Sequence, residues 1–216
     1  MIRTYSVADV LSLLSGAGWT LLLAAAVFLG SALIGCLIAL MRMSPVRPLR
    51  WLAVGYIQLV QGIPPLVWLF VLFYGIAMQG WTINAWFSAG IGLSVYSGAF
   101  LGEIWYGALA SVPKTQWEAG ASLGLSRRQQ LSRIILPQSV RIAIPPTVGF
   151  LVQIVKETSL VSTIGIFELT LAGRFLSAAT YRPLEAYALV AVVYFLICFP
   201  LTHWSRALER KLNADR

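Results

Sequence analysis

The stretch from Val10 to Met41, VLSLLSGAGWTLLLAAAVFLGSALIGCLIALM, decides the fold class, because its 32 residues include no charged side chain. A helix needs about 20 consecutive, mainly apolar residues to cross the hydrocarbon core of a bilayer. This stretch therefore predicts a transmembrane helix. It is longer than the roughly 7–15 apolar residues of a secretory signal peptide and lacks a strongly basic start, so we expect it to be retained.

Composition places the whole chain in the same class. Of its 216 residues, 58% are hydrophobic and 11% are charged, whereas about 25% of the residues in a soluble protein are charged. The mean hydropathy is +0.78. These values exclude a soluble globular domain, a disordered chain and a disulfide scaffold. Cys36 and Cys198 both lie in apolar runs, and we expect both to be small core residues without a disulfide.

The charge-free runs predict five membrane spans. A second run without charge, Trp51 to Gly102, has 52 residues, which is too long for one helix, and Gly and Asn residues between 75 and 90 divide it. The predicted spans are about 17–41, 51–75, 88–110, 141–160 and 185–207. The expected fold is therefore all-α, a polytopic membrane protein in which residues 1–216 form a single transmembrane domain.

Basic residues give the orientation. Twelve of the 16 Lys and Arg residues follow the first, third and fifth predicted spans, and the loop at 76–87 has none. The net charge of +8 would also be compatible with nucleic-acid binding. However, basic residues beside membrane spans typically mark cytoplasmic loops. We therefore expect no nucleic-acid partner, an N-terminus outside and a C-terminus in the cytoplasm.

The cytoplasmic loop 111–140 is longer and more patterned than a plain connector. Thr115-Gln116-Trp117-Glu118 and Ser126-Arg127-Arg128-Gln129 both have the form of a capping box, and Gly124 lies between them as a helix terminator. The pattern predicts two short helices around a Gly turn, the second running to Leu136-Pro137. Such an element either docks into a partner or lies as an amphipathic loop on membrane lipid.

The spacing within this loop resembles the EAA coupling loop of ATP-binding cassette (ABC) importer permeases. That pattern is EAA, three residues, Gly, nine residues and I-x-L-P. Here it falls on Glu118-Ala119-Gly120, Gly124 and Ile134-x-Leu136-Pro137. Only Gly120 departs from it, and it replaces one small residue with a smaller one. The resemblance implies that the residues that couple the permease to an ATPase are Glu118, Ala119, Gly120, Gly124, Leu136 and Pro137.

Other segments are similar to the polar amino acid permeases within that group. Gln61-Gly62-Ile63-Pro64-Pro65 resembles their R-G-T-P-L segment, and Glu103 to Leu109 resembles E-I-x-R-G-A-L. Residues 135–138 resemble I-L-P-Q, and residues 156–160 resemble K-D-T-S-L. Gln61 stands where Arg is common and Tyr106 where a basic residue is common, and both departures bear on substrate preference.

The resemblance implies a permease subunit in the bacterial inner (cytoplasmic) membrane that pairs with a second, identical or homologous permease. Two cytoplasmic ATPase subunits would bind ATP and Mg, and an amino acid-binding protein on the periplasmic or extracellular side would deliver substrate. The chain itself has no G-x-x-x-x-G-K-[ST] sequence and a single histidine, His203. We therefore expect it to be no enzyme, with no cofactor and no metal site.

Two features within the predicted spans are candidates for the substrate site. The prolines at Gly62-Ile63-Pro64-Pro65 remove backbone donors near the middle of the second span. One interpretation is a half-helix that starts at Pro64 and directs its positive end at a substrate carboxylate. The other is a packing kink.

Charged residues inside spans are costly and usually functional. Glu157 is a candidate partner for a substrate amino group, with Thr158 and Ser159 as hydrogen-bonding neighbours. Alternatively, Lys156 and Glu157 mark the outer membrane boundary. For Glu103 an interhelical hydrogen bond or salt link is favoured. The predicted substrate-binding residues are Gln61, Gly62, Pro64, Glu103, Glu157, Thr158 and Ser159.

The leading prediction is a permease that translocates a polar or charged amino acid, with a short amphipathic helix at 166–179 on the outer side. One alternative is a permease for another small zwitterion such as a betaine, which predicts an aromatic cage for a quaternary ammonium. Another is a membrane anchor subunit that does not transport. An anchor predicts intact helices without a Pro-Pro break.

Overall fold

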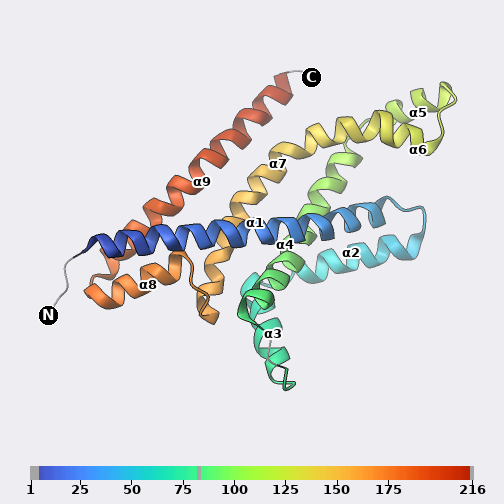
Figure 1. Cartoon of the computed structure of the whole chain (residues 1–216). Coiled ribbons are helices and arrows are strands. Elements are labelled where there is room, and N and C mark those ends of the chain that lie inside the picture. The colour runs from blue at the N-terminus through green and yellow to red at the C-terminus, as the bar shows by residue number, and fades with distance from the viewer. Residues whose placement is uncertain (1–4, 82–83, 215–216) are drawn as a thin grey trace.

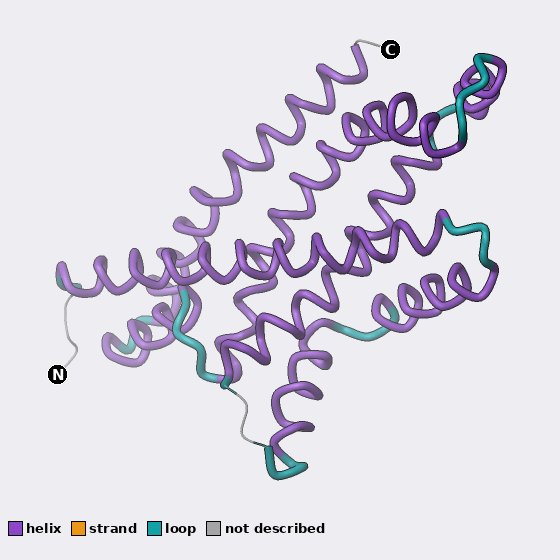
Figure 2. The backbone as a smooth tube through the Cα atoms, turned by 45° about the vertical axis from the view of Figure 1, so that its right-hand side comes forward, coloured by secondary structure: helices purple, strands orange, loops and turns teal. Residues whose placement is uncertain are grey.

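The computed structural model describes residues 5–81 and 84–214, and within them every regular element is helical (Figure 1, Figure 2). The helices are α1 (Val7–Met43), α2 (Arg47–Gln61), α3 (Pro65–Ala77), α4 (Ala85–Ala110), α5 (Lys114–Ser122), α6 (Arg127–Gln130), a π-helical segment η1 (Leu131–Ile135), α7 (Leu136–Glu157), a 3-10 segment η2 (Thr158–Ile164), α8 (Leu169–Thr180) and α9 (Pro183–Ala214). The expected all-α class is confirmed.

α1 crosses the whole molecule and packs along α4 (Figure 1). Small residues allow the two backbones to approach closely, as they do in many membrane helix pairs. A Cβ added at Gly98 would lie 2.7 Å from Ile34, and one added at Gly102 would lie 2.7 Å from Ile38. The α1–α4 contact therefore leaves these two helices little freedom to change how they pack.

We expect Gly98→Ala to destabilise the permease by about 1–3 kcal/mol, because the added methyl group has no space against Ile34. Gly90→Ala is the matched control on the same helix, since nothing lies within 4 Å of its added Cβ. Thermal unfolding of both variants in detergent measures the difference. Equal midpoints would contradict the packing argument.

The predicted second span is not one helix. α2 ends at Gln61, α3 begins at Pro65, and their axes are bent by 95°. The bend follows from the missing N–H groups of Pro64 and Pro65. Trp68 Nε1 donates to Val60 O at 3.3 Å and so satisfies one carbonyl at the end of α2. The expected break is present, but the continuous span over 51–75 is corrected.

Three helical stretches of the described chain are long and apolar enough to cross a membrane, Val7–Met43, Arg127–Ile164 and Pro183–Leu212. The bent pair α2 and α3 gives a fourth if it counts as one span. α4 has 26 residues but is not among these stretches. The polytopic character is supported, while the five-span arrangement and its orientation stay predictions.

The loop after α4 forms the predicted helical hairpin, but the first of its two helices is capped differently from the prediction. Pro113 is the N-cap of α5 and no side chain caps it, so the Thr115–Glu118 box does not form. The Ser126–Gln129 box does form. Gly124 has φ +73°, and the N–H groups of Gly124 and Leu125 close the turn on Ala121 O and Gly120 O.

The second helix of the hairpin does not end at Leu136-Pro137, as the sequence pattern predicted. α6, η1 and α7 follow one another without a loop, from Arg127 to Glu157. α7 also continues through Pro145-Pro146. One helical rod therefore runs from the tip of the hairpin into the bundle.

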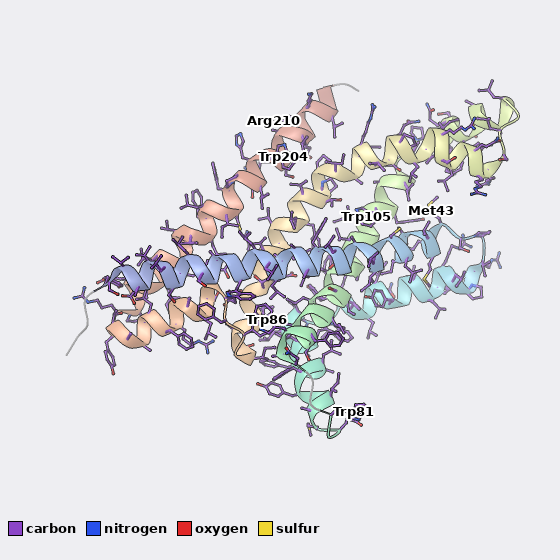
Figure 3. All side chains as sticks on the ribbon, viewed as in Figure 1. Met43, Trp81, Trp86, Trp105, Trp204 and Arg210 are labelled. Carbon is purple, nitrogen blue, oxygen red and sulfur yellow. The ribbon has the colours of Figure 1, made fainter. Side chains whose placement is uncertain are left out.

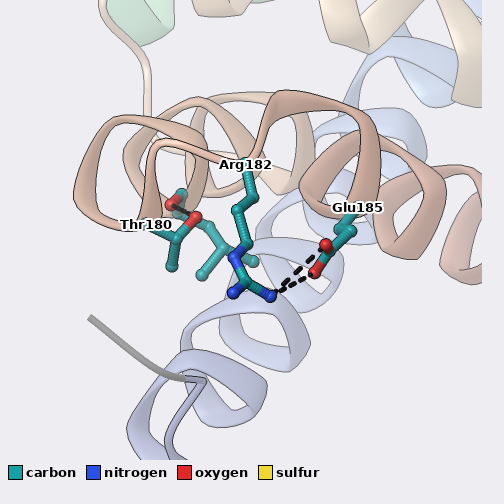
Figure 4. Close-up of polar contacts among 4 residues, drawn as sticks. Thr180, Arg182 and Glu185 are labelled. Carbon is teal, nitrogen blue, oxygen red and sulfur yellow. Dashed lines mark hydrogen bonds and ion pairs between the residues drawn. The ribbon is translucent and has the colours of Figure 1, made fainter. Parts of the chain in front are cut away.

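The last third of the chain places two helices against α1. The predicted helix at 166–179 is present as α8, and Glu168 accepts a hydrogen bond from Leu171 N at its start. α8 turns into α9 at Tyr181, where φ is +55°. Close to this turn, Arg182 pairs with Glu185 at 3.3 Å (Figure 4). Both cysteines are free thiols, but only Cys198 is buried, so a core position for Cys36 was wrong.

Candidate translocation site

Glu103 on α4 links to both α1 and α2 through its exposed carboxylate. Its carboxylate lies 3.5 Å from Arg42 Nη1 of α1 and accepts a hydrogen bond from Gln61 Nε2 of α2 at 2.9 Å. The Arg42 guanidinium also lies 4.0 Å from the centre of the Tyr106 ring. The interhelical link favoured for Glu103 is therefore present, and its cationic partner, Arg42, was not among the predicted site residues.

Glu157 occupies a different environment at the end of α7. Its side chain is buried, and its carboxylate accepts hydrogen bonds from Ser97 Oγ at 3.4 Å and Gln153 Nε2 at 3.2 Å. No Lys or Arg of the described chain lies within ion-pair distance of it. A buried carboxylate with neutral donors only retains capacity for a cation. Its burial against α4 argues against a simple boundary charge.

The hydroxyl groups beside Glu157 are engaged with the backbone. Thr158 Oγ1 donates to Val155 O at 2.8 Å, and Ser159 Oγ donates to Lys156 O at 2.7 Å. Each hydroxyl oxygen still has lone pairs with which to accept a hydrogen bond. Thr158 is fully buried and Ser159 is half-buried. These two residues thus offer acceptors near Glu157.

The start of α3 offers little to an anion in this conformation. Pro65 has no N–H, and the N–H groups of Val67 and Trp68 already donate to Pro64 O at 3.0 and 3.3 Å. Gly62 is in an ordinary helical conformation with φ −74°. The packing interpretation of Gly62 and Pro64 therefore accounts for what the structure describes there.

The predicted substrate-binding residues fall into two groups. Gln61 meets Glu103 at the α2–α4 contact, whereas Glu157, Thr158 and Ser159 follow one another where α7 gives way to η2. In the described chain no hydrogen bond or ion pair joins the groups. Ser97, the partner of Glu157, lies six residues before Glu103 on α4, about 9 Å along the axis.

The predicted coupling residues lie on and below the hairpin. Glu118 and Ala119 are exposed on α5, and Leu136 and Pro137 are exposed at the start of α7. Gly120 is buried, and a Cβ there would lie 3.0 Å from Gln130 Cγ and 3.1 Å from Ile134 Cδ1. The hairpin therefore presents the acidic residue outward while its glycine allows α5 to pack closely on α6 and η1.

Comparison with known families agrees with this architecture. Residues 31–214 match the family described as binding-protein-dependent transport system inner membrane component. The chain belongs to this family. It is therefore a membrane component of an ABC transport system, as the resemblance implied, and that family comprises permease subunits rather than the ATPase.

Curated relatives in the family cover most of the chain. The probable amino-acid ABC transporter permease protein YckA of Bacillus subtilis is 39% identical over 198 residues, 92% of this chain and 88% of the relative. The L-cystine transport system permease protein TcyB of the same organism is 37% identical over 187 residues, 86% of this chain and 80% of the relative. Sequence similarity thus extends through the bundle and the hairpin.

Chains of two solved ABC transporter structures share the fold. A chain of an amino acid ABC transporter crystallised with histidines superimposes with a TM-score of 0.88, at 29% identity, over 97% of this chain and all of that chain. The MetNI methionine transporter in an inward-facing conformation gives a TM-score of 0.75 at 18% identity, over 94% of this chain and 99% of that chain, which is evidence of the fold alone.

Proposed function

We propose that this inner membrane component is the permease subunit of an importer that moves a polar or charged amino acid into the cell. It works as a pair with a second permease subunit. Two cytoplasmic ATPase subunits bind ATP and Mg and supply the energy, and a binding protein on the outer side delivers the substrate. Relatives named as amino acid permeases support the substrate class.

The environment of Glu157 is the observation that carries the proposal. An intramembrane carboxylate is costly unless a cation or several donors compensate it. Ser97 and Gln153 supply two neutral hydrogen bonds, which leaves the negative charge without a counterion. A substrate ammonium group supplies that counterion when it binds, with Thr158 and Ser159 as neighbouring acceptors.

The hairpin of α5 and α6 is the proposed contact with the ATPase. Its exposed Glu118 and Ala119 form the docking face, and the continuous helical stretch from Arg127 to Glu157 joins that face to the substrate carboxylate. A movement of the ATPase therefore displaces α7 and the position of Glu157 together. In this proposal the hairpin, with Gly124, Leu136 and Pro137, lies in the cytoplasm and α8 lies on the outer side, which is the orientation that the basic residues predict.

Two alternatives fit the structure less well. A permease for a betaine needs an aromatic cage, but Tyr96, Phe100 and Phe150 pack ring against ring, with centroids 5.1 and 5.4 Å apart. A membrane anchor without a transport pathway needs no broken helix, whereas α2 and α3 bend by 95° at Gly62–Pro64. An amino acid with a primary ammonium group therefore remains the favoured substrate.

The test is ATP hydrolysis by the complex reconstituted with its ATPase subunits and its binding protein. We expect one or a few polar amino acids to stimulate hydrolysis and to accumulate in vesicles, because substrate release by the binding protein is coupled to the ATPase. Glycine betaine is the control ligand. Stimulation by betaine but by no amino acid would assign the permease to the other zwitterion class.

A further inference from the structure

A recess that does not include Glu157 lies between α7 and α9, whose ends diverge in Figure 1. It is a cavity of about 910 Å³ closed on one side by residues 111–113 at the end of α4. We call it the α7–α9 cleft. It opens at the end of the bundle that carries the hairpin, and none of the predicted substrate residues lines it.

The wall formed by α7 carries backbone acceptors that have lost their helical donors. Pro145 and Pro146 lie inside α7 and have no N–H, so the carbonyl groups of Arg141 and Ile142 receive no hydrogen bond from them. All four residues line the cleft. On the facing wall, Ser205 Oγ donates a hydrogen bond to Pro145 O at 2.8 Å. This bond joins α9 to α7 about one helical turn after Arg141.

Opposite charges line the same cleft on its two walls. Arg141 comes from α7 and Glu209 from α9, and both side chains are exposed. The ion pairs of the described chain do not include this pair. A guanidinium binds a carboxylate through two parallel hydrogen bonds, and a carboxylate together with backbone carbonyl oxygens is a suitable receptor for an ammonium group.

We propose that the α7–α9 cleft is a second binding site for a free zwitterionic amino acid. Arg141 binds its α-carboxylate, and Glu209 with the carbonyl oxygens of Arg141 and Ile142 binds its ammonium group. The proposal rests on the proposed function for one point, that this end faces the cytoplasm. An amino acid bound there bridges α7 and α9, and it slows import when the internal concentration is high.

The test is protection of a cysteine in the cleft. Gly149 lines it, and a Cβ there makes only ordinary contact, 3.5 Å from Ser205 Oγ. The purified complex with Gly149→Cys, in a background of Cys36→Ser and Cys198→Ala, is labelled in lipid nanodiscs with a water-soluble maleimide. We expect L-glutamine or L-arginine at ten times its dissociation constant to slow labelling about tenfold by mass action.

Matched controls separate the proposed ligand from other effects. Glutamine amide lacks the carboxylate and N-acetylglutamine lacks the ammonium group, and we expect neither to protect. Arg141→Gln and Glu209→Gln should each remove protection, whereas Arg210→Gln, which lies on α9 but does not line the cleft, should retain it (Figure 3).

Two outcomes would overturn the proposal. Equal labelling with and without amino acid would show that the cleft is not a site for this class of ligand. Protection that depends on phosphatidylethanolamine in the nanodisc, and not on added amino acid, would assign the cleft to a lipid headgroup. Because labelling needs no transport, it is independent of whether the complex imports amino acids.

Discussion

Replacing Glu157 with Gln is expected to lower the uptake of cationic amino acids by about 30-fold or more, since the loss of a desolvated charge partner costs about 2–5 kcal/mol. Gln keeps the size of the side chain and can still accept from Ser97 and Gln153. Assembly should therefore be unchanged. Uptake of arginine, glutamine and aspartate by reconstituted complex measures the effect on each substrate class.

The pattern across substrates distinguishes two roles of Glu157. If its charge binds the α-ammonium group, all amino acids lose uptake, and cationic ones lose most because Glu157 also attracts the side chain. If the permease instead imports acidic amino acids, Glu157 does not serve as the substrate's charge partner. Their uptake should then be unchanged or rise when the charge is removed. Glu185→Gln is the matched control, because Glu185 is exposed and pairs with Arg182 away from the α4–α7 contact.

A result in which Glu157→Gln changes no substrate would remove Glu157 from the site. The remaining candidates would then be Gln61 and Glu103, with Arg42 as the cation that faces them. In that arrangement the substrate would compete with Arg42 for Glu103. Arg42→Gln would then alter substrate preference, which it should not do if Glu157 is the ammonium partner.

Local chemistry in the sequence predicts the elements that depend on neighbouring residues. The Gly124 turn and the Ser126 box form as expected because each needs only the residues of its own segment. The Thr115 box fails for an equally local reason. Pro113, two residues earlier, accepts from Gln116 N and starts α5 before Thr115 can act as its cap.

The partners of Glu103 and Glu157 could not be predicted in this way, because they come from distant helices. Arg42 reaches Glu103 across 61 positions of sequence, and Ser97 reaches Glu157 across 60. One indirect signal was available for α4. Its Gly98-x-x-x-Gly102 spacing predicts close packing against another helix, and the structure identifies that helix as α1.

The hairpin offers the second large effect, which concerns Glu118. The carboxylate of Glu118 is exposed and its residue does not complete a capping box, so Glu118→Lys should leave the fold of the permease intact. Reversing the charge on a docking face is expected to cost about 2 kcal/mol or more in binding the ATPase. We therefore expect uptake to fall about 30-fold, with loss of the ATPase subunit from the purified complex.

A companion variant separates docking from hairpin structure. Gly120→Val places two methyl groups against Gln130 and Ile134, where even a Cβ lies at 3.0–3.1 Å. It should loosen α5 from η1 and lower both the thermal stability of the permease and its coupling. Glu118→Lys should lower coupling alone, and Ser132→Lys, on the exposed surface of η1, should lower neither. If Glu118→Lys copurifies with the ATPase and transports like the parent chain, the hairpin is not the docking element. The continuous helical stretch of α6, η1 and α7 would then not be the link between ATP hydrolysis and Glu157.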